Sequence, residues 1–399
     1  MLELLAPAGN LSKLKTAIIF GADAVYIGGE EFSLRTAADN FTREEMVEGI
    51  NFAHERGKKV YVAVNIVPRN DELERISEYA EILYEIGADG VIVSDLGAFS
   101  VIRKAAPDLP VHISTQANNT NYESANLWHS MGASRIVLAR ELSLDEIKGI
   151  REKLPEDCEI EVFVHGAMCV SYSGRCLLSN YLTNRDSNKG ECAQPCRWKY
   201  YLMEEKRPGE YMPVFENDKG TFIFNSKDLC MIEHIKELDE AGVKSLKIEG
   251  RVKSEYYVST VVKAYRRAID DYYAGKEFDK ALYDEVLKVS HREYSKGFYF
   301  GNPEQIYTYG SYVRNYDIVG VVLDYDADTK MATIEQRNRF FKGDTVEFMP
   351  PEGDHITVKV EKILTEEGEE TDSAPHPQQI LKIPVDFPLE KETVMRKEV

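Results

Sequence analysis

Eight short apolar runs recur along the first 250 residues, and amphipathic stretches separate most of them. Stretches such as "NLSKLKTAIIFG" and "ELERISEYAEILYEIGA" place apolar residues at helical spacing and have a glycine near the end. Apolar strands that alternate with helices indicate a parallel sheet, and eight such units favour an α/β fold of the (β/α)8 type, a TIM-like barrel. A doubly wound sheet is the alternative, but no G-x-G-x-x-G follows the first strand. The eight runs are "LELLAPAG", "DAVYIGG", "KVYVAVN", "GVIVSD", "VHISTQ", "RIVLAR", "EIEVFVHG" and "SLKIEG".

The pattern changes near the end of the chain. From about residue 312 it becomes period-two strands with turn signals between them, as in "DIVGVVLDYD" and "HITVKVEKIL". We therefore expect a barrel domain over residues 1–305 and a small antiparallel β-barrel domain over residues 312–399. The seventh and eighth strands are about 80 residues apart, so a long insertion at about 166–226 interrupts the barrel. Long connections in compact domains are usually functional.

Polar residues follow the predicted strands at their C-terminal ends. In a barrel of this kind the active site lies at those ends, so these residues are candidates to line it. Any single one of these residues is equally well explained as an ordinary loop residue. Because such residues recur at one strand end after another, we expect them to line a common site. The candidates are Arg35, Asn65, Ser94, Asp95, Ser114, Thr115, Gln116, Arg140, Glu141, His165, Lys247, Glu249 and Arg251.

Composition narrows the class of protein. The chain has 43% hydrophobic and 29% charged residues, and no apolar run approaches the length of a membrane span. We therefore expect a cytoplasmic protein without a membrane anchor. A net charge of -19 argues against a large non-specific nucleic-acid surface, although an enzyme that modifies one nucleotide needs only a local basic patch.

Four of the six cysteines cluster in the insertion, at Cys169, Cys176, Cys192 and Cys196. Disulfides are rare in the cytosol, so clustered thiols point to a metal or to catalysis. Their spacing is not the pair of C-x-x-C knuckles typical of structural zinc, and by itself it leaves zinc and an iron-sulfur cluster open. The two remaining cysteines, Cys158 and Cys230, are isolated and are expected to be bystanders.

The stretch "EVFVHGAMCVSYSGRCLLS", residues 161–179, resembles the signature of the peptidase U32 family. The fixed positions of that signature fall on Glu161, Phe163, Gly166, Cys169, Gly174, Cys176 and Ser179. The resemblance extends over nearly the whole chain and implies a TIM-like barrel followed, in one branch, by a small β domain. It also implies that the four clustered cysteines hold a 4Fe-4S cluster.

The resemblance implies a function as well. The family carries an old collagenase-like protease name, but branches of it are iron-sulfur hydroxylases, and the length and the appended domain are most similar to the branch that forms 5-hydroxyuridine in tRNA with prephenate as co-substrate. An rRNA hydroxylase of the same family, a peptidase, and a cluster-bearing RNA-binding scaffold without turnover are the alternatives. Because no H-E-x-x-H occurs and His165 merely precedes Cys169, peptidase chemistry has little support from the residues themselves. The expected partners are tRNA and a second family subunit.

Roles follow for the strand-end residues under the hydroxylase hypothesis. Arginine suits bidentate binding of carboxylates, so the substrate-binding candidates are Arg35, Gln116, Arg140 and Arg251. The candidates for proton transfer are His165, Lys247 and Glu249. The basic and aromatic stretch "RWKYY", Arg197 to Tyr201, fits either stacking against RNA bases or an ordinary strand that packs its aromatics inward.

Overall fold

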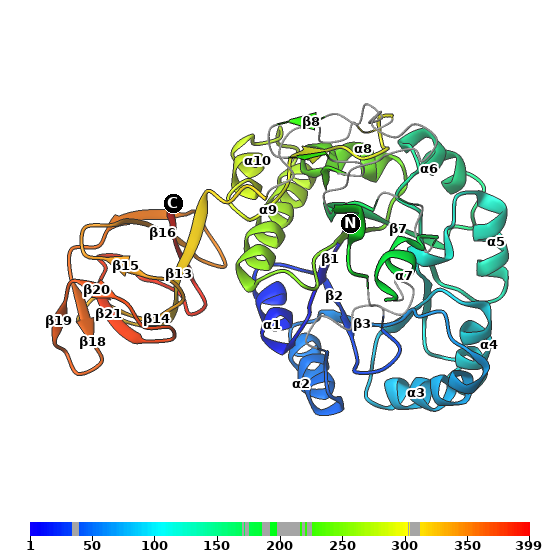
Figure 1. Ribbon diagram of the computed structural model, residues 1–399, viewed down its shortest axis with the longest axis horizontal. Coiled ribbons are helices and arrows are strands. Elements are labelled where there is room, and N and C mark those ends of the chain that lie inside the picture. The colour runs from blue at the N-terminus through cyan, green and yellow to red at the C-terminus, as the bar shows by residue number, and fades with distance from the viewer. Residues whose placement is uncertain are drawn as a thin grey trace, which may run out of the picture.

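The computed structural model describes residues 1–33, 40–169, 171, 175–185, 192–197, 216–217, 220–221, 226–301, 303 and 312–399. Eight parallel strands form a closed barrel, because the last strand pairs with both the first and the seventh. The predicted TIM-like barrel is therefore confirmed, and all eight apolar runs are its strands (Figure 1). The strands are β1 Glu3–Pro7, β2 Ala24–Gly28, β3 Lys59–Val64, β4 Gly90–Val93, β5 Val111–Ile113, β6 Arg135–Val137, β7 Glu159–Ala167 and β11 Ser245–Ile248.

Helices surround the barrel, and local sequence explains where many of them begin. Thr42 and Ser143 each form a capping box with the glutamate three residues later, while Asp95 accepts a hydrogen bond from the N–H of Ala98 at 2.9 Å. The long helix α9 covers β1 with its buried face and packs against α1 and α10. The helices of this ring are α1 Leu11–Ile19, α2 Arg43–His54, α3 Leu73–Glu85, α4 Leu96–Ala105, α5 Tyr122–Ser130, α6 Leu144–Arg151, α8 Ile235–Glu240, α9 Glu255–Tyr273 and α10 Ala281–Val286, with short 3₁₀ turns at Asn70–Glu72, Thr115–Ala117 and Ile232–His234.

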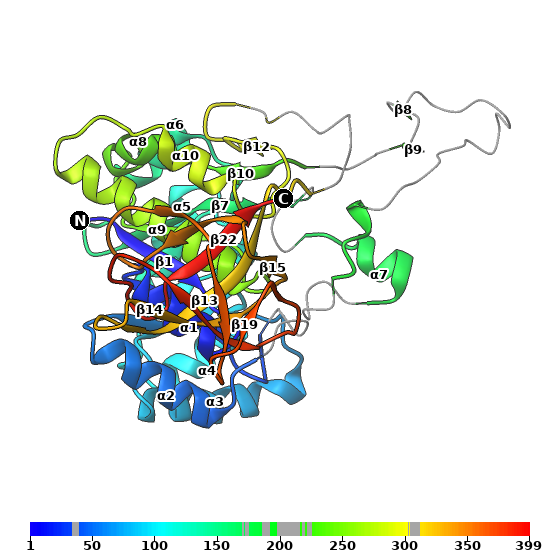
Figure 2. The ribbon, with the colours of Figure 1, turned by 90° about the vertical axis from the view of Figure 1, so that its left-hand side faces the viewer.

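The long connection between β7 and β11 starts directly at the end of β7. In its described part the elements are α7 Leu178–Thr183, a 3₁₀ turn at Pro195–Arg197, β8 Glu216–Asn217, β9 Gly220–Thr221 and β10 Asp228–Cys230. Strand β10 runs antiparallel to the end of β7, and β12 Tyr294–Ser295 pairs with β10. Figure 2 shows α7 beyond the C-terminal ends of the barrel strands, on the side opposite the N-terminus.

The second domain is confirmed as a separate antiparallel sheet, which curls into a half-barrel around its own apolar core. Its strand order is β17-β16-β22-β13-β14-β21-β18-β19, and β15 pairs with β20 beside it. The strands are β13 Tyr316–Asp326, β14 Met331–Gln336, β15 Phe340–Phe341, β16 Thr345–Met349, β17 Ile356–Lys359, β18 Ile363–Thr365, β19 Glu370–Thr371, β20 Ser373–Ala374, β21 Ile380–Pro384 and β22 Val394–Glu398.

A buried ion network joins the two domains. Arg396 of β22 is fully buried and donates to Glu285 of α10 at 2.8 Å and to Glu347 of β16 at 2.6 Å. Lys288 also donates to Glu347 at 3.0 Å, and Met349 packs into the barrel's apolar core. Among the described residues, no helix is long and apolar enough to cross a membrane.

Candidate functional site

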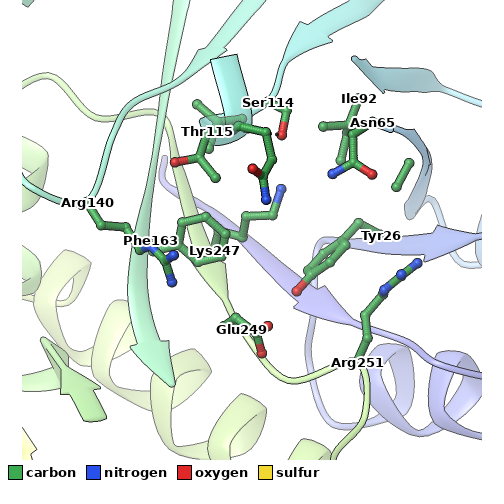
Figure 3. A pocket seen from close by; sticks show the side chains of 13 residues that line it. Tyr26, Asn65, Ile92, Ser114, Thr115, Arg140, Phe163, Lys247, Glu249 and Arg251 are labelled. Atoms are coloured by element: carbon green, nitrogen blue, oxygen red, sulfur yellow. Dashed lines mark hydrogen bonds between the residues drawn. The ribbon is translucent and has the colours of Figure 1, made fainter. Parts of the chain in front are cut away.

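A cavity of about 110 Å³ opens at the C-terminal end of the barrel. Figure 3 shows polar side chains from strands on opposite sides of the barrel converging on it. Eight of the strand-end candidates line this cavity, together with apolar residues that the polar pattern of the strand ends had not singled out. The lining consists of Tyr26, Ala63, Asn65, Ile92, Ser114, Thr115, Gln116, Val137, Arg140, Phe163, Lys247, Glu249 and Arg251.

Lys247 projects from β11 between two aromatic rings at the base of the cavity. Its ammonium lies 4.5 Å from the centre of the Tyr26 ring and 5.5 Å from that of Phe163. Its Nζ donates to Oε1 of Glu161 at 2.7 Å, and both side chains are almost completely buried. Lys247 is therefore a fixed cation whose charge is balanced by the carboxylate of Glu161.

The carboxylate of Glu161 belongs to a larger ion network inside the barrel. Arg135 donates to Glu161 at 3.1 Å, to Glu3 at 2.6 Å and to Glu159 at 2.5 Å. Burial would raise the pKa of Glu3, but the adjacent Arg135 outweighs burial and holds that pKa below its ordinary value. The interior beneath the cavity thus contains a buried ion network beside the apolar cluster of Leu5, Ala24, Tyr26, Tyr61 and Ile92.

Arg251 reaches the cavity from the loop after β11 and is held by Ser33. Its Nη2 donates to the Ser33 hydroxyl at 2.8 Å. Two glycines make room for it: a Cβ at Gly28 would lie 2.0 Å from Nη1 of Arg251, and a Cβ at Gly9 would lie 2.2 Å from its backbone oxygen. The glycines of "LLAPAG" and "DAVYIGG" therefore serve the close approach of this arginine.

Arg140 connects the cavity to the start of the cysteine segment. Its Nη1 donates to the backbone oxygen of Ala167 at 3.0 Å, and its guanidinium lies 5.3 Å from the centre of the Phe163 ring. Ala167 ends β7, two residues before Cys169. The same side chain therefore lines the cavity and fixes the backbone that leads to the first clustered cysteine.

Glu249 is positioned through its backbone. Its N–H donates to the oxygen of His165 at 2.9 Å, and its own oxygen accepts from the Tyr257 hydroxyl at 2.9 Å. Gly166 has a φ of +108°, and a Cβ there would lie 2.7 Å from the oxygen of Glu249. This glycine of the family signature thus lets β7 and the Glu249 loop approach closely.

His165 does not join the other predicted site residues. The pairing of β7 with β11 shifts register between Lys247 and Ile248, and His165 packs against Tyr265 and Tyr294 behind the barrel wall. Burial lowers its pKa to about 3, so its ring is neutral. Its role in proton transfer stays a prediction, and it is not among the residues that line the cavity.

Three other candidates have partners that a structural role accounts for, or lie elsewhere. Ser94 donates to the backbone oxygen of Asn65 at 2.9 Å, and Asp95 caps α4. Glu141 lines a separate open groove beside the cavity. Arg35 and residues 198–201 lie outside the described residues, as does the side chain of Arg197.

The four clustered cysteines all lie on segments beyond the end of β7, and each is partly exposed. Helix α7 contacts the 3₁₀ turn that carries Cys196, and the Ser179 hydroxyl accepts from the N–H of Ala193 at 3.0 Å. Within the described residues, no three of these thiol sulfurs lie within 4.8 Å of one another.

Cys158 and Cys230 differ from the clustered cysteines in their surroundings. Both are fully buried, and burial raises the pKa of each thiol to about 11. Such thiols are inert and do not bind metals readily. Over the described part of the chain, the one other grouping with metal-ligand chemistry is Glu285, Glu347 and His355, but the Arg396 guanidinium already pairs with both carboxylates.

Comparison with known proteins agrees with this architecture. The model of peptidase family U32 matches residues 9–308, and that of the peptidase family U32 C-terminal domain matches residues 314–396. The chain therefore belongs to peptidase family U32.

Relatives within this family carry names that refer to RNA hydroxylation. The chain is 45% identical to tRNA hydroxylation protein P1 of Bacillus subtilis, covering 99% of this chain and 94% of that protein. It is 40% identical to tRNA hydroxylation protein P of Escherichia coli, over 97% and 94% of the two chains. It is also 39% identical to the 23S rRNA 5-hydroxycytidine C2501 synthase of Escherichia coli, over 67% of this chain and 39% of that protein.

Proposed function

We propose that this protein is an iron-sulfur-dependent enzyme that hydroxylates tRNA, forming 5-hydroxyuridine at the wobble position in the cytoplasm. The observation that carries the proposal is the placement of four clustered cysteines directly beyond a polar barrel cavity, in a chain similar over nearly its whole length to proteins named for tRNA hydroxylation. The relative named as an rRNA synthase is matched over a smaller part of its length, so tRNA is the favoured substrate.

The donor set suits a 4Fe-4S cluster. Cys169, Cys176, Cys192 and Cys196 supply four thiolates, the usual ligands of such a cluster. When bound, the cluster would supply electron transfer at the mouth of the cavity. The contact between α7 and the Cys196 turn, together with the Ser179 hydrogen bond, keeps the two cysteine pairs on adjacent segments without any metal.

The cavity residues divide into a cationic set and a set of neutral polar groups. Arg140, Lys247 and Arg251 present positive charge from three directions, which suits the carboxylates of a co-substrate such as prephenate, with Arg35 as a further predicted contact. Gln116 and Asn65 offer amide groups that can hydrogen-bond a base edge. Glu249 is the cavity's carboxylate and is proposed to move a proton, whereas Lys247, predicted for the same role, is held as a cation by Glu161.

The decisive experiment is nucleoside mass spectrometry of tRNA from a deletion strain that lacks every other family member. Loss of 5-hydroxyuridine and its derivatives, restored by the wild-type gene but not by Cys169→Ser, supports the proposal. Unchanged tRNA with loss of an rRNA hydroxycytidine would move the assignment to the rRNA branch. Cleavage of gelatin by metal-free protein would favour a peptidase, and RNA binding without turnover would favour a scaffold. Restoration that requires a second family member would identify the predicted partner subunit.

A further inference from the structure

Helix α7 presents its apolar side chains to solvent at the mouth of the barrel. Leu177, Tyr181 and Leu182 are 51%, 83% and 51% exposed, and Tyr181 is the most exposed large hydrophobic residue in the described part of the chain. Figure 2 shows that α7 projects from the end of the barrel at which the cavity opens. Apolar side chains exposed together beside a functional site usually mark an interaction surface.

The polar side of the same helix faces inward. Ser179 is completely buried, its hydroxyl accepts from the N–H of Ala193, and its backbone oxygen accepts from the Thr183 hydroxyl at 2.7 Å. An amphipathic helix on a protein surface normally buries its apolar face. Because α7 is fixed through its small polar residues instead, the outward direction of Tyr181 is built into the local structure.

The charge around α7 differs from that of the rest of the molecule. Arg175 and Arg185 flank the helix and are both exposed. No aspartate or glutamate occurs from residue 162 to residue 185, whereas the whole chain has 68 acidic residues and a net charge of -19. This helix is therefore a locally cationic, aromatic surface on an acidic protein.

An open groove of about 760 Å³ continues from this surface toward the cavity. The groove is lined by Asn118, Thr120, Glu141, Leu142, Glu146, Ser171 and Arg175, so that Arg175 shares it with two carboxylates. The groove lies beside the cavity, because Asn118 and Leu142 follow the cavity residues Gln116 and Arg140 by two positions. A chain lying along the groove would have one of its units at the cavity mouth.

We propose that Leu177, Tyr181 and Leu182 with Arg175 and Arg185, here called the α7 surface, bind the single-stranded RNA next to the target base. This inference rests on the proposed function and extends it to the site of RNA recognition. Unpaired bases stack on exposed aromatic rings and on arginine planes, and phosphates bind arginine. A protein partner of this surface would bury the leucines in an apolar interface, and the two exposed arginines that flank α7 favour a polyanion.

The test compares binding of a tRNA anticodon stem-loop by variants of the anaerobically prepared holoprotein, using fluorescence anisotropy at several salt concentrations. Tyr181→Ala should weaken binding about 5- to 150-fold, the range for the loss of stacking on one base, while Tyr181→Phe should bind normally. Removing both charges in Arg175→Gln/Arg185→Gln should reduce the slope of log K against log salt by about 1.4. The matched controls are Tyr84→Ala and Arg43→Gln on the outer helices, which are also exposed and should leave binding unchanged.

Two further measurements distinguish failure of this inference from failure of the proposed function. Iron content per chain should be unchanged in every variant, because none of these side chains is a cluster ligand. If wild-type protein hydroxylates tRNA but Tyr181→Ala binds and modifies it normally, the inference is wrong and the proposed function stands. If wild-type protein neither binds nor modifies tRNA, both are wrong. A photo-crosslinking residue at position 181 that reacts with a protein partner, with RNA binding intact, would also overturn the inference.

Discussion

Replacing Glu161 by leucine should destabilise the barrel by about 3 to 5 kcal/mol. Glu161 is completely buried and is the one carboxylate paired with Lys247 among the described residues, at 2.7 Å. Without it the Lys247 ammonium is left buried and uncompensated, which typically costs that much. Arg135 would not be left alone, because it keeps its ion pairs with Glu3 and Glu159. The cost therefore arises almost entirely at Lys247.

A double-mutant cycle tests this assignment. Lys247→Met alone should cost about 1.5 to 3 kcal/mol, since Glu161 keeps Arg135 at 3.1 Å and loses one charge-assisted hydrogen bond. Glu161→Leu combined with Lys247→Met removes both charges, so its cost should be clearly smaller than the sum of the two single costs. We expect a coupling energy of about 2 to 3 kcal/mol between the two sites.

Urea unfolding followed by tryptophan fluorescence is a suitable assay. Both tryptophans, Trp128 and Trp198, belong to the barrel part of the chain, and residues 312–399 contain none, so the signal reports barrel unfolding. The exposed pair of Arg75 and Glu31 provides the control, because Arg75→Gln should change stability by less than about 0.5 kcal/mol. A cost below about 1 kcal/mol for Glu161→Leu, or strict additivity in the cycle, would refute the reasoning.

Three other predictions concern the site and its pH dependence. Gly28→Ala should displace the Arg251 guanidinium and lower tRNA hydroxylation at least tenfold, measured by nucleoside analysis of tRNA. Its cost in stability should be only about 1 to 3 kcal/mol, measured by urea unfolding. Normal hydroxylation by this variant would contradict the prediction. We expect about four irons per chain after anaerobic purification, and serine at Cys169, Cys176, Cys192 or Cys196 should abolish them, whereas Cys158→Ser and Cys230→Ser should retain them. Stoichiometric zinc instead of iron would contradict the cluster assignment. Because burial lowers the pKa of His165 to about 3 and of His355 to about 4, the unfolded chain binds more protons than the native one between pH 6.5 and 4. As the pH is lowered through that window, the free energy of unfolding should therefore decrease by roughly 1.4 kcal/mol per pH unit for each histidine. His165→Gln should reduce this dependence of stability on pH.

The eight barrel strands could be predicted because parallel strands buried on both faces are nearly continuous apolar runs. The last strand of the second domain, β22, was less visible, because it ends in three consecutive charged residues and buries Arg396 against carboxylates from α10 and β16. A buried arginine has no apolar signature, and its partner Glu285 is 111 residues away. Pairing at that distance is a property of the packed domains and not of the local pattern.

The site was predictable in its location and less so in its details. The rule that strand ends form the site of a barrel placed Gln116, Arg140, Lys247, Glu249 and Arg251 together. The same rule did not predict that His165 lies apart from these residues, because one irregularity in the pairing of β7 with β11 decides which way the His165 ring faces. It also gave no sign of Tyr26 and Phe163, whose rings confine the Lys247 ammonium, since aromatic residues inside strands are ordinary core residues in most proteins.

Closure of the barrel by β1 against β11 has a consequence for synthesis of the chain. The strand that is made first, Glu3–Pro7, finds its second neighbour only when residues 245–248 have left the ribosome. At typical elongation rates that delay is on the order of 10 to 50 s, during which one edge of the growing sheet stays unpaired. All four clustered cysteines emerge within this interval, before β11. The proposed cluster ligands are therefore available before the barrel can close.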